Sequence, residues 1–596
     1  MAKFKSSATD SGAVESVPTQ AFDVVVIGGG PAGMAAALAA HKAGARVAIV
    51  EREQHLGGIL RQCIHPGFGL SHFKQELTGP EYAQRFIEQV HATDIALFLN
   101  SMVLGIDSDE GASAGDPGTG EAVGTAAVHT VTLMSRAGML QLTGRAVVLA
   151  MGCRERTRSE IKIPGSRPAG VFTAGLAQRY INIENLKPGS RAVILGSGDI
   201  GLIMARRCTL EGISVEGVYE LMPYANGLRR NVKNCLDDFG IPLHLSTTVT
   251  RVIGHDRVEA VEVSQVDEHL APIAGTERIV PCDTLLLSVG LIPENELSVA
   301  AGVELDPRTC GAVVDQSLQT GVPGIFACGN VLHVHDLADN VTTESERAGA
   351  AAAAWALGGD AGASAAGTHC ELTVSPAGIA GYALPGRITA VALTKLNFRV
   401  RRPVDAARVR ILAGGEELFA GKVRAFKPSV MESFPLPAKV IQRALDLGVS
   451  EIVLSVDPVE EAYLMSTNVT KTLQFNCTTC PSECLLTVEV ERDVNGSVAA
   501  VHSVTGNRCP RGDKFAHQEL TCPMRVLTTT VAVSGGDEAL LPVRTSEAIP
   551  LELHAQAMAF IRGLVVNAPI RMGDVVLENL LDTNINLIAS MDIDPA

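Results

Sequence analysis

Two stretches of this 596-residue chain repeat one arrangement of glycines and a distant carboxylate. In the first, Gly28, Gly30 and Gly33 follow an apolar run, a helix-forming run begins at Pro31, and Glu51 comes 18 residues after the last glycine. Glycines at these positions permit a sharp turn, let a diphosphate approach the backbone, and allow a helix to pack closely on a strand. The free N–H groups at the helix start attract the same diphosphate, and a carboxylate roughly 20 residues further on binds ribose hydroxyls. The first stretch therefore predicts a dinucleotide site.

The second copy of the arrangement has Gly196, Gly198 and Gly201, with Glu220 following the last glycine by 19 residues. Glycine-rich turns are common, so one such pattern is weak evidence. Because both copies carry the flanking apolar strands and the distal acid, a pair of dinucleotide sites is favoured over incidental turns. Two dinucleotides bound in series suggest that electrons pass from one to the other.

Four cysteines near the C-terminal end have the spacing of a metal site. Cys477, Cys480, Cys484 and Cys509 are separated by two, three and 24 residues. Close thiolates on a turn, closed by a distant fourth after a β-hairpin, form a tetrahedral sulfur site. Such a site accepts a 4Fe–4S cluster or a structural zinc ion, and a cysteine group without metal is a third alternative.

Cys63 and His65 lie in a glycine-rich loop, residues 55–70, and are candidates for catalysis. Cys63 could be a single redox thiol, stabilised as thiolate or sulfenate, and His65 could shuttle protons. The alternatives are a small buried packing residue and a histidine that only makes hydrogen bonds in its loop.

Composition and charge limit the class of protein. Hydrophobic residues make up 46% of the chain and charged residues 19%, which is typical of a globular protein. The net charge of −16 argues against nucleic acid or an anionic membrane as the main partner. We expect a disordered tail over residues 1–20, with no signal peptide and no transmembrane segment in the chain. The thirteen cysteines, with the last five crowded into residues 477–522, fit a reducing compartment and a metal site better than a disulfide framework in a chain without an export signal, so we expect the cytoplasm.

Residues 21–368 resemble the pyridine nucleotide–disulfide oxidoreductase superfamily, the flavoproteins that bind two dinucleotides. The resemblance rests on both glycine motifs and on the segments VVLAMG and IFACGN, at 147–152 and 325–330. It implies an α/β fold with two Rossmann-like domains, the first binding FAD and interrupted by a second that binds NAD(P)H. The segments 152–156 and 169–178 further resemble the subgroup related to opine and sarcosine oxidase subunits.

The resemblance carries expected cofactor contacts onto this chain. For FAD these are Gly28, Gly30, Pro31, Ala32, Gly33, Glu51, Gly58, Gly152, Gly290, Gly329 and Asn330. For the nicotinamide dinucleotide they are Gly196, Gly198, Asp199, Ile200, Gly201 and Glu220.

The chain departs from the superfamily pattern at two places. Its disulfide reductases carry two cysteines spaced CxxxxC beside the flavin, and this chain has only Cys63 in that loop, so a dithiol exchange within the loop is not available. Asn330 stands where the family usually has an aspartate, and it can still accept a ribityl hydroxyl bond.

Residues 475–512 resemble the N-terminal iron–sulfur domain of molybdopterin oxidoreductases, in which four such cysteines hold a 4Fe–4S cluster. Residues 471–596 as a whole resemble an uncharacterised domain family found beside or fused to such flavoproteins. A flavin accepts two electrons at once and releases them singly, which favours a cluster over zinc at this site. The expected domains are the tail 1–20, an FAD-binding domain at 21–165 and 285–368, an NAD(P)-binding domain at 166–284, a β-rich domain at 369–470, and a four-cysteine domain at 471–596.

The predicted function is electron transfer between NADH, FAD and the cluster. Glu220 would repel the 2′-phosphate of NADPH, which favours NADH. The family-level partner is a flavoprotein dehydrogenase of the glycerol-3-phosphate type, and we expect the chain to act as an oligomer or as one component of a complex. The alternatives are an NADH oxidase or peroxidase that uses Cys63, and a non-catalytic scaffold subunit that binds nucleotides and zinc.

Overall fold

The computed structural model describes residues 17–109, 128–358, 369–459, 472–479, 484–492 and 498–596. Most of the tail predicted for residues 1–20 lies outside these ranges. Its last residues do not fit the prediction, because Thr19–Ala21 form strand β1 and pair in parallel with β9 (Gly138–Gly144). The main-chain bond from Gln141 N–H to Pro18 O, 2.9 Å long, extends this pairing, so regular structure starts before residue 20.

The first glycine motif belongs to a five-stranded parallel sheet with the order β21-β10-β2-β3-β6. Its strands are β2 (Val24–Ile27), β3 (Val47–Val50), β6 (Ala96–Phe98), β10 (Ala146–Leu149) and β21 (Ile325–Ala327). Valine, isoleucine, leucine and alanine fill most of these strands because a parallel sheet is covered on both faces. One edge strand, β21, comes from a segment far along the chain from the other four.

Helices α1 (Pro31–Lys42) and α7 (Ala338–Ala356) pack against this sheet and against each other. A Cβ added to Gly349 would lie 2.0 Å from the carbonyl oxygen of Ala36, so the two helix backbones touch at a glycine. Helix α2 (Gly79–His91) begins with a capping box, in which Thr78 and Glu81 satisfy each other's main-chain N–H groups.

The second glycine motif belongs to another five-stranded parallel sheet, with the order β12-β19-β13-β14-β15. Its strands are β12 (Val171–Thr173), β13 (Arg191–Leu195), β14 (Ser214–Tyr219), β15 (Leu243–His244) and β19 (Thr284–Leu287). The helices of this unit are α3 (Ala174–Asn182), α4 (Asp199–Leu210) and α5 (Arg229–Cys235). The predicted α/β class with two Rossmann-like units is confirmed. The domain boundaries stay predictions.

Antiparallel strands surround the two parallel sheets. Beside the first sheet lie β7 (Met102–Asp109), β8 (Val128–Ser135) and β9, and beside the second lie β16 (Thr247–Gly254), β17 (Val258–Gln265) and β18 (Arg278–Pro281). The two units are joined by β11 (Cys153–Glu155) and β20 (Leu291–Pro293), which pair with each other.

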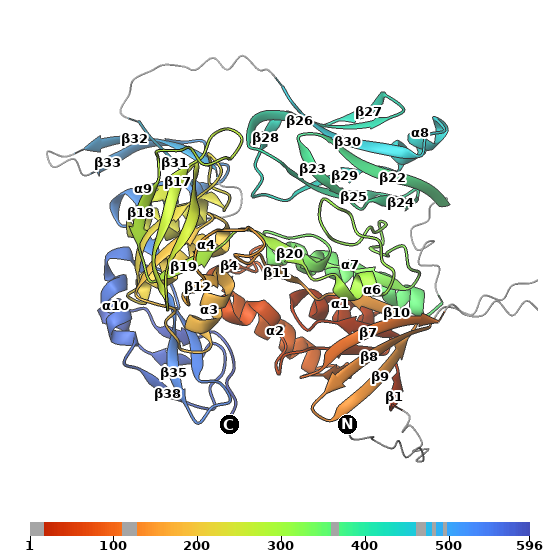
Figure 1. Ribbon diagram of the computed structural model, residues 1–596, viewed down its shortest axis with the longest axis horizontal. Coiled ribbons are helices and arrows are strands. Elements are labelled where there is room, and N and C mark those ends of the chain that lie inside the picture. Colours follow the sequence, from red (N-terminus) through yellow and green to blue (C-terminus); the bar gives the residue numbers. More distant parts are fainter. Residues whose placement is uncertain (1–16, 110–127, 359–368, 460–471, 480–483, 493–497) are drawn as a thin grey trace, which may run out of the picture.

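Residues 369–459 form two sheets that lie over the first unit, at the upper right of Figure 1. One contains β22 (His369–Gly378), β24 (Arg387–Ala390), β26 (Val404–Ala413), β27 (Glu416–Ala420), β28 (Arg424–Phe426) and β30 (Glu451–Pro458). The other contains β23 (Ala380–Leu384), β25 (Thr394–Val400) and β29 (Glu432–Leu436). Helix α8 (Ala438–Asp446) packs its apolar face on this core, and Tyr382 and Leu384 pack into the core of the first unit.

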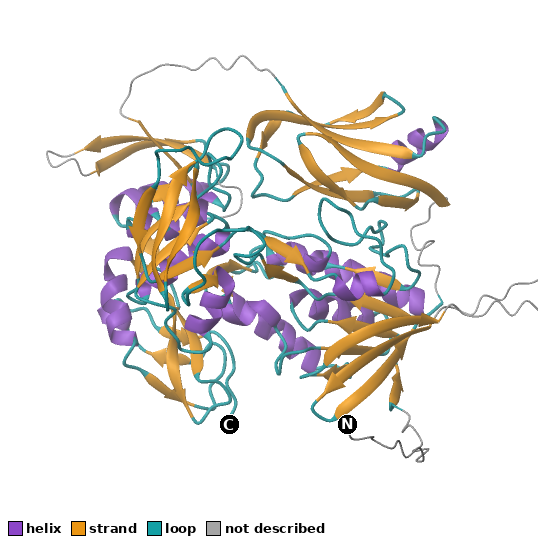
Figure 2. Ribbon diagram, viewed as in Figure 1, coloured by secondary structure: helices purple, strands orange, loops and turns teal. Residues whose placement is uncertain are grey.

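The C-terminal part, which consists of the described residues from 472 to 596, lies beside the second unit (Figure 1), and Figure 2 shows that it combines strands with helices. The cysteine-bearing segment has β31 (Thr472–Asn476), β32 (Leu485–Arg492), β33 (Val498–Thr505) and α9 (Pro510–Thr521). After β34 (Met524–Arg525) and its partner β37 (Ile549–Pro550), a five-stranded sheet packs with α10 (His554–Ile561). Its strands are β35 (Thr528–Ser534), β36 (Leu540–Thr545), β38 (Val565–Asn567), β39 (Val575–Leu577) and β40 (Leu587–Ala589). None of the helices in the described ranges is long and apolar enough to cross a bilayer.

Candidate functional site

The first glycine loop, Gly28–Gly33, connects β2 to α1 and has no room for side chains at its ends. Gly28 has a φ of +108°, and a Cβ there would lie 2.4 Å from the carbonyl oxygen of Ala150. A Cβ on Gly33 would lie 1.7 Å from the carbonyl oxygen of Gly28. Gly30 caps the N-terminus of α1, with Pro31 as the first helical residue, so the free N–H groups of that helix face the loop.

Glu51, just after β3, is held in place below the first glycine loop. Its Oε2 accepts a 2.6 Å hydrogen bond from Gly29 N–H, and its Oε1 accepts a 2.8 Å bond from Glu53 N–H. The residue is buried. Both carboxylate oxygens are therefore fixed by the main chain, and the contact of this acid with a ribose stays a prediction.

Two other glycine-bearing segments approach the same loop. A Cβ on Gly58, whose φ is +54°, would lie 3.0 Å from Gly30 Cα. A Cβ on Gly329, whose φ is +72°, would lie 2.7 Å from the Cβ of Ala32. These segments bring backbone and one methyl group, rather than large side chains, close to the loop, as a bound diphosphate and its sugar require. The residues around the loop therefore fit FAD, and this place is called the predicted flavin groove.

Gly152 and Gly290 lie where the chain crosses between the two units. They have φ values of +75° and +108° and flank the β11–β20 pair, with Glu294 N–H bound to Gly152 O at 3.1 Å. Asn330 uses its side chain within the protein: its Oδ1 accepts from His335 N–H at 3.0 Å, and its Nδ2 lies 3.5 Å from Cys153 Sγ. Flavin contacts by these residues stay predictions.

The second glycine loop, Gly196–Gly201, repeats the geometry of the first between β13 and α4. Gly196 has a φ of +95°, and a Cβ there would lie 2.0 Å from the carbonyl oxygen of Ser288. Gly198 caps α4, and a Cβ on Gly201 would lie 2.7 Å from the carbonyl oxygen of Gly196. Only glycine fits at both ends of this loop as well.

Glu220 occupies the place in the second unit that Glu51 occupies in the first. Its Oε2 accepts from Ser197 N–H at 2.8 Å and its Oε1 from Met222 N–H at 2.8 Å. Ser197 stands at the same position of its loop as Gly29, and its hydroxyl adds a 2.5 Å hydrogen bond to Glu220 Oε2. The sequence motifs did not single out this serine.

Asp199 and Ile200 are also expected to contact the dinucleotide. In the structure, Asp199 fixes the start of α5 and Ile200 packs against the core. Asp199 Oδ1 accepts from Leu228 N–H at 2.8 Å and from Asn231 Nδ2 at 2.7 Å, which fixes the start of α5. Burial raises the pKa of this carboxyl group, and the hydrogen bonds only partly offset that effect. Ile200 packs at the edge of the apolar core of the second unit.

Cys63 and His65 lie between the two units, facing α3. Cys63 Sγ is 3.6 Å from Gln178 Oε1, and burial raises the pKa of the thiol to about 12, so it is neutral near pH 7. Burial also lowers the pKa of His65 to about 4, with smaller contributions from Arg230 and Arg206. Its Nδ1 lies 3.1 Å from Pro66 O, which leaves Nε2 as a proton acceptor. These surroundings favour the packing interpretation of Cys63 over a reactive thiolate.

Three of the predicted metal ligands lie beside the small sheet β31–β32–β33 and at the start of α9: Cys477 follows β31, Cys484 precedes β32, and Cys509 precedes α9. Cys477 is buried, and its N–H donates to Cys484 O at 2.8 Å, which closes the turn between β31 and β32. Cys509 caps α9, where hydrogen bonds from Arg511 and Gly512 lower the pKa of its thiol. Cys480 lies outside the described residues. The sulfur atoms of Cys477, Cys484 and Cys509, all within the described ranges, are not gathered within 4.8 Å of one another.

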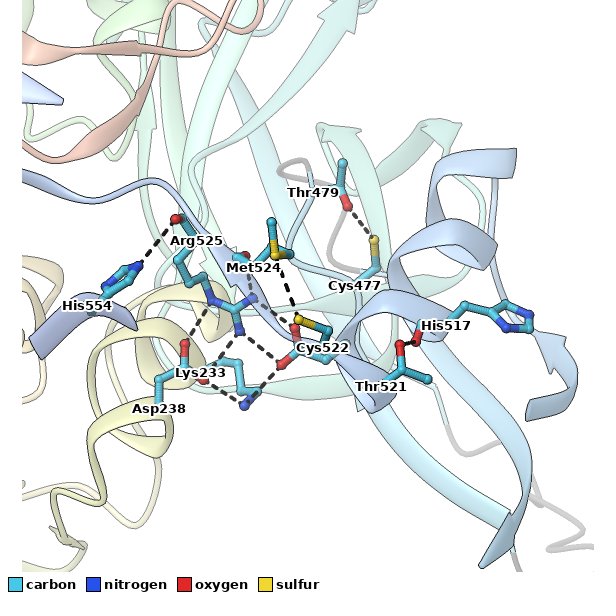
Figure 3. Close-up of polar contacts among 11 residues, drawn as sticks. Lys233, Asp238, Cys477, Thr479, His517, Thr521, Cys522, Met524, Arg525 and His554 are labelled. Atoms are coloured by element: carbon cyan, nitrogen blue, oxygen red, sulfur yellow. Dashed lines mark hydrogen bonds and ion pairs between the residues drawn. The ribbon is translucent and has the colours of Figure 1, made fainter. Parts of the chain in front are cut away.

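A buried network of ion pairs holds the C-terminal part against the second unit (Figure 3). The guanidinium of Arg525 donates to Asp238 Oδ2 at 2.8 Å and to both oxygens of Glu519 at 2.9 Å. Lys233 bridges the same two acids, at 2.8 Å from Asp238 and 3.2 Å from Glu519. Since Glu519 lies on α9, the network positions the helix that Cys509 begins.

A cavity of about 70 Å³ lies where three parts of the chain meet. These are the glycine-rich loop 55–70, here called the redox loop, the second unit, and the cysteine-bearing segment. His65 and Thr478 line it, and these residues are close in sequence to Cys63 and Cys477 respectively. Arg206, Arg207 and Arg230 contribute positive charge to its wall. The redox loop and the cysteine-bearing segment therefore share one cavity, although they lie far apart in the sequence.

One group of buried polar residues was missed by the sequence analysis. His333, His335 and Glu344 lie between the predicted flavin groove and β23. The His-x-His spacing was a usable signal, but the carboxylate comes from the following helix, and only the fold brings it to the two rings.

Comparison with known proteins agrees with this architecture. The model of the family described as "Pyridine nucleotide-disulphide oxidoreductase" matches residues 22–354, and that of a family of unknown function, DUF1667, matches residues 510–591. An opine oxidase subunit from Agrobacterium tumefaciens (strain Ach5) is 28% identical over 323 residues, which is 52% of this chain and 61% of that protein. The HcnB subunit of hydrogen cyanide synthase from Pseudomonas protegens is 28% identical over 301 residues, 47% of this chain and 59% of that protein.

The chain thus spans about three fifths of the length of these two relatives. Among solved structures, the thioredoxin reductase of T. acidophilum is similar with a TM-score of 0.44 and 22% identity, covering 57% of this chain and 99% of that one. The family match extends over more than half of the chain and contains both glycine loops. This chain belongs to the pyridine nucleotide-disulphide oxidoreductase family.

Proposed function

We propose that this enzyme transfers electrons between NADH, a bound FAD and a 4Fe–4S cluster held by Cys477, Cys480, Cys484 and Cys509. The observation that carries the proposal is the shared cavity, because His65 of the redox loop and Thr478 of the cysteine-bearing segment line the same space. An electron leaving the flavin region would have the cysteine-bearing segment as its neighbour.

The residues proposed to hold FAD are those of the predicted flavin groove. The first glycine loop would bind the diphosphate, Glu51 the ribose, and the turn at Gly329–Asn330 the ribityl chain. Bound FAD would supply an acceptor for the two electrons of a hydride and release them one at a time. The role of the chain is to orient the two dinucleotides and to exclude water between them.

The preference for NADH is proposed from Glu220 and from the placement of the nearby arginines. A fixed carboxylate beside the ribose repels a 2′-phosphate by about 1 to 4 kcal/mol at 4 Å, depending on the effective dielectric constant. Arg229 contacts the side chain of Asn476 at 3.3 Å, and Arg230 lines the cavity beside Gly67. Arg229 is thus placed at the cysteine-bearing segment and Arg230 at the cavity. Because both arginines have these other placements, the proposed nucleotide site is one that prefers NADH to NADPH.

The cluster is proposed over zinc because of the electron count, whereas the state of Cys509 favours a metal site of either kind. The thiolate is the ligand form of cysteine, and the hydrogen bonds of Arg511 favour it at this position. A 4Fe–4S cluster would supply a one-electron carrier next to a cofactor that releases single electrons.

We further propose that the enzyme is cytoplasmic and works as an oligomer or as one component of a complex. Both relatives are named as subunits of their enzymes, which supports this expectation. The proposed partner is a flavoprotein dehydrogenase of the glycerol-3-phosphate type, with electrons flowing either to or from NAD.

The decisive experiment combines metal and sulfide analysis with reduction by NADH, on protein purified without oxygen. We expect iron and acid-labile sulfide in equal amounts, bleaching of the flavin by NADH, and a cluster signal in electron paramagnetic resonance after reduction. Cys509→Ser should lose iron and sulfide but keep flavin bleaching, and Cys522→Ser, which changes an exposed cysteine outside the motif, should keep both. Zinc alone in the wild type would contradict the cluster, and a protein that NADH does not bleach would contradict the enzyme itself.

A further inference from the structure

His333, His335 and Glu344 form a buried cluster, here called the His–Glu triad, that no step above uses. Each residue offers one donor atom, and the three donor atoms lie within 4.8 Å of one another. The side chains of both histidines are 1% exposed and that of Glu344 is 4% exposed. The histidines lie in the loop after β21, and the glutamate lies on α7.

Two members of the triad are oriented by contacts made with their other polar atoms. Glu344 Oε1 accepts a 2.9 Å hydrogen bond from Gly329 N–H, and His333 Nδ1 lies 3.1 Å from the hydroxyl of Tyr382 on β23. These contacts leave Glu344 Oε2 and His333 Nε2 facing each other at 2.8 Å. Metal ligands in proteins are held in this way, by partners bound to the atom that does not touch the metal.

His335 is the unsatisfied member of the triad. Neither of its ring nitrogens has a hydrogen-bond partner among the described residues, although both are buried. Its Nε2 lies 3.5 Å from Glu344 Oε2. Buried polar atoms in folded proteins are nearly always paired, and this long ion-pair contact with Glu344 is a weak substitute for a hydrogen bond, so the imidazole lacks the partners that its burial requires unless an occupant supplies them.

We propose that the His–Glu triad binds a divalent transition-metal ion, with zinc as the best-matched ion, through His333 Nε2, His335 Nε2 and Glu344 Oε2. Two ligand atoms at 2.0–2.1 Å from a tetrahedral ion lie about 3.3 Å apart. The two distances to Glu344 Oε2, 2.8 and 3.5 Å, bracket that separation, so small side-chain movements suffice.

His333 can bind the metal without gaining or losing a proton. A neutral His333 can carry its proton on either nitrogen, and metal at Nε2 places the proton on Nδ1, which then donates to the Tyr382 hydroxyl. The neighbouring cation Arg399 lies 3.4 Å from Asp336 Oδ1 and also donates to Val334 O. Its charge is thus partly balanced by an acid outside the triad.

The site would differ from the cysteine motif in its ligands, which are nitrogen and oxygen only. It would tie the turn at Gly329, part of the predicted flavin groove, to β23 in the strands after residue 369. Zinc has no redox chemistry, so its role there is to stiffen the groove rather than to carry electrons. The inference does not depend on the proposed cluster or on the preference for NADH.

The test uses the full chain with Cys477→Ser and Cys509→Ser, so that the cysteine motif keeps only two of its four ligands. After loading with zinc and removal of excess, we expect one zinc ion per chain. X-ray absorption at the zinc edge should show nitrogen and oxygen neighbours at about 2.0–2.1 Å and no sulfur at about 2.3 Å. His335→Gln and Glu344→Gln in this background should lose the zinc, whereas His255→Gln, at an exposed histidine, should keep it.

Circular dichroism and flavin content report whether each variant folds. Should the ligand variants fail to fold, Tyr382→Phe removes only the hydroxyl, which contacts His333 and Arg399, and should weaken zinc affinity by about 10–100-fold. No zinc in the folded double-cysteine protein, unchanged zinc in folded His335→Gln, or unchanged affinity in Tyr382→Phe would each overturn the proposal. The three side chains would then be a hydrogen-bonded group without metal.

Discussion

Glu220 accepts two hydrogen bonds from Ser197, one from its N–H at 2.8 Å and one from its hydroxyl at 2.5 Å. The corresponding acid of the first unit, Glu51, accepts from the main-chain N–H groups of Gly29 and Glu53 but gains no hydroxyl bond from its loop, because Gly29 stands where Ser197 stands. The second acid is therefore fixed more firmly than the first. A fixed charge discriminates between ligands better than a mobile one, since it cannot swing away from a repelling group.

Replacing that charge should relax the choice of nicotinamide cofactor. Glu220→Gln keeps the size of the side chain and a carbonyl oxygen for Ser197, but it removes the repulsion of a 2′-phosphate. We expect the ratio of kcat/KM for NADH to that for NADPH to fall by about tenfold or more. Steady-state dye reduction with each cofactor measures the ratio. Glu51→Gln is the matched control, and it should lower flavin retention while leaving the NADH-to-NADPH ratio unchanged. An unaltered ratio in Glu220→Gln would mean that Glu220 does not face the 2′ position.

A methyl group at Gly33 should disrupt the first glycine loop. A Cβ there meets Gly28 O at 1.7 Å, which forces a backbone shift, and overpacking of this kind costs about 1–3 kcal/mol. We expect Gly33→Ala to lower both the melting temperature and the flavin bound per chain. Gly321→Ala is the control, since a Cβ at Gly321 meets nothing within 4 Å. Equal flavin content in the two variants would show that the groove lies elsewhere.

Cys63→Ser separates electron transfer from thiol chemistry. Because burial raises the pKa of Cys63 to about 12, the thiol is a poor nucleophile, and the variant should keep NADH-dependent dye reduction to within about twofold. Peroxide reduction by NADH should be slow in both proteins. Fast peroxide reduction in the wild type that disappears in Cys63→Ser would instead establish the peroxidase alternative.

Arg525→Met should detach the C-terminal part from the second unit. Removing one partner of a buried ion network leaves Asp238 and Glu519 short of positive charge, at a cost of about 3–5 kcal/mol. We expect earlier unfolding in urea and faster proteolysis in the C-terminal part. Arg571→Met breaks an exposed pair with Asp594 and should leave the urea midpoint of unfolding nearly unchanged. Similar losses in both variants would contradict a stabilising role for the buried network.

Acid should weaken a second contact of the C-terminal part, at Glu538. Burial alone would raise the pKa of this acid, but hydrogen bonds and charge from His55 and Arg61 outweigh burial and lower it to about 2. A folded-state pKa below the unfolded one adds stability that is full above the unfolded value and is lost as pH falls toward about 2. With solvent screening, we expect a loss of about 1–3 kcal/mol between pH 4.5 and 2. In urea titrations, the free energy of unfolding of Glu538→Gln should decline less steeply over that pH interval than that of the wild type. An identical slope would show that Glu538 does not cause the loss.

The glycine units could be predicted from the sequence because local geometry determines them. An apolar strand, a turn that only glycine can make and a helix with free N–H groups leave few alternatives, and Val24–Ile27, Pro31–Lys42 and Arg191–Leu195 formed as expected. Residues 104–127, by contrast, are small and acidic and suggest a surface insertion. Their first part completes β7, because pairing with β8 decides the conformation there.

The relations between distant segments could not be predicted. The contact of Arg525 with Asp238 and the shared cavity of His65 and Thr478 join segments far apart in the chain, and no local pattern encodes them. The same holds for Glu344, whose distance to His333 depends on the angle between a loop and a helix. Motif spacing identifies groups that can do chemistry, whereas the packing of whole units decides which groups meet.

The origin of β21 has a consequence for biosynthesis. Strand β10 is complete at Leu149, but the strand that covers its outer edge arrives only with Ile325–Ala327. On the ribosome, the nascent first sheet therefore exposes unpaired N–H and carbonyl groups while the entire second unit is translated, and such an edge invites pairing with other chains. Rapid cotranslational folding of the inserted unit shortens this period, so mutations that slow it should reduce the yield of soluble enzyme even when the finished protein is stable.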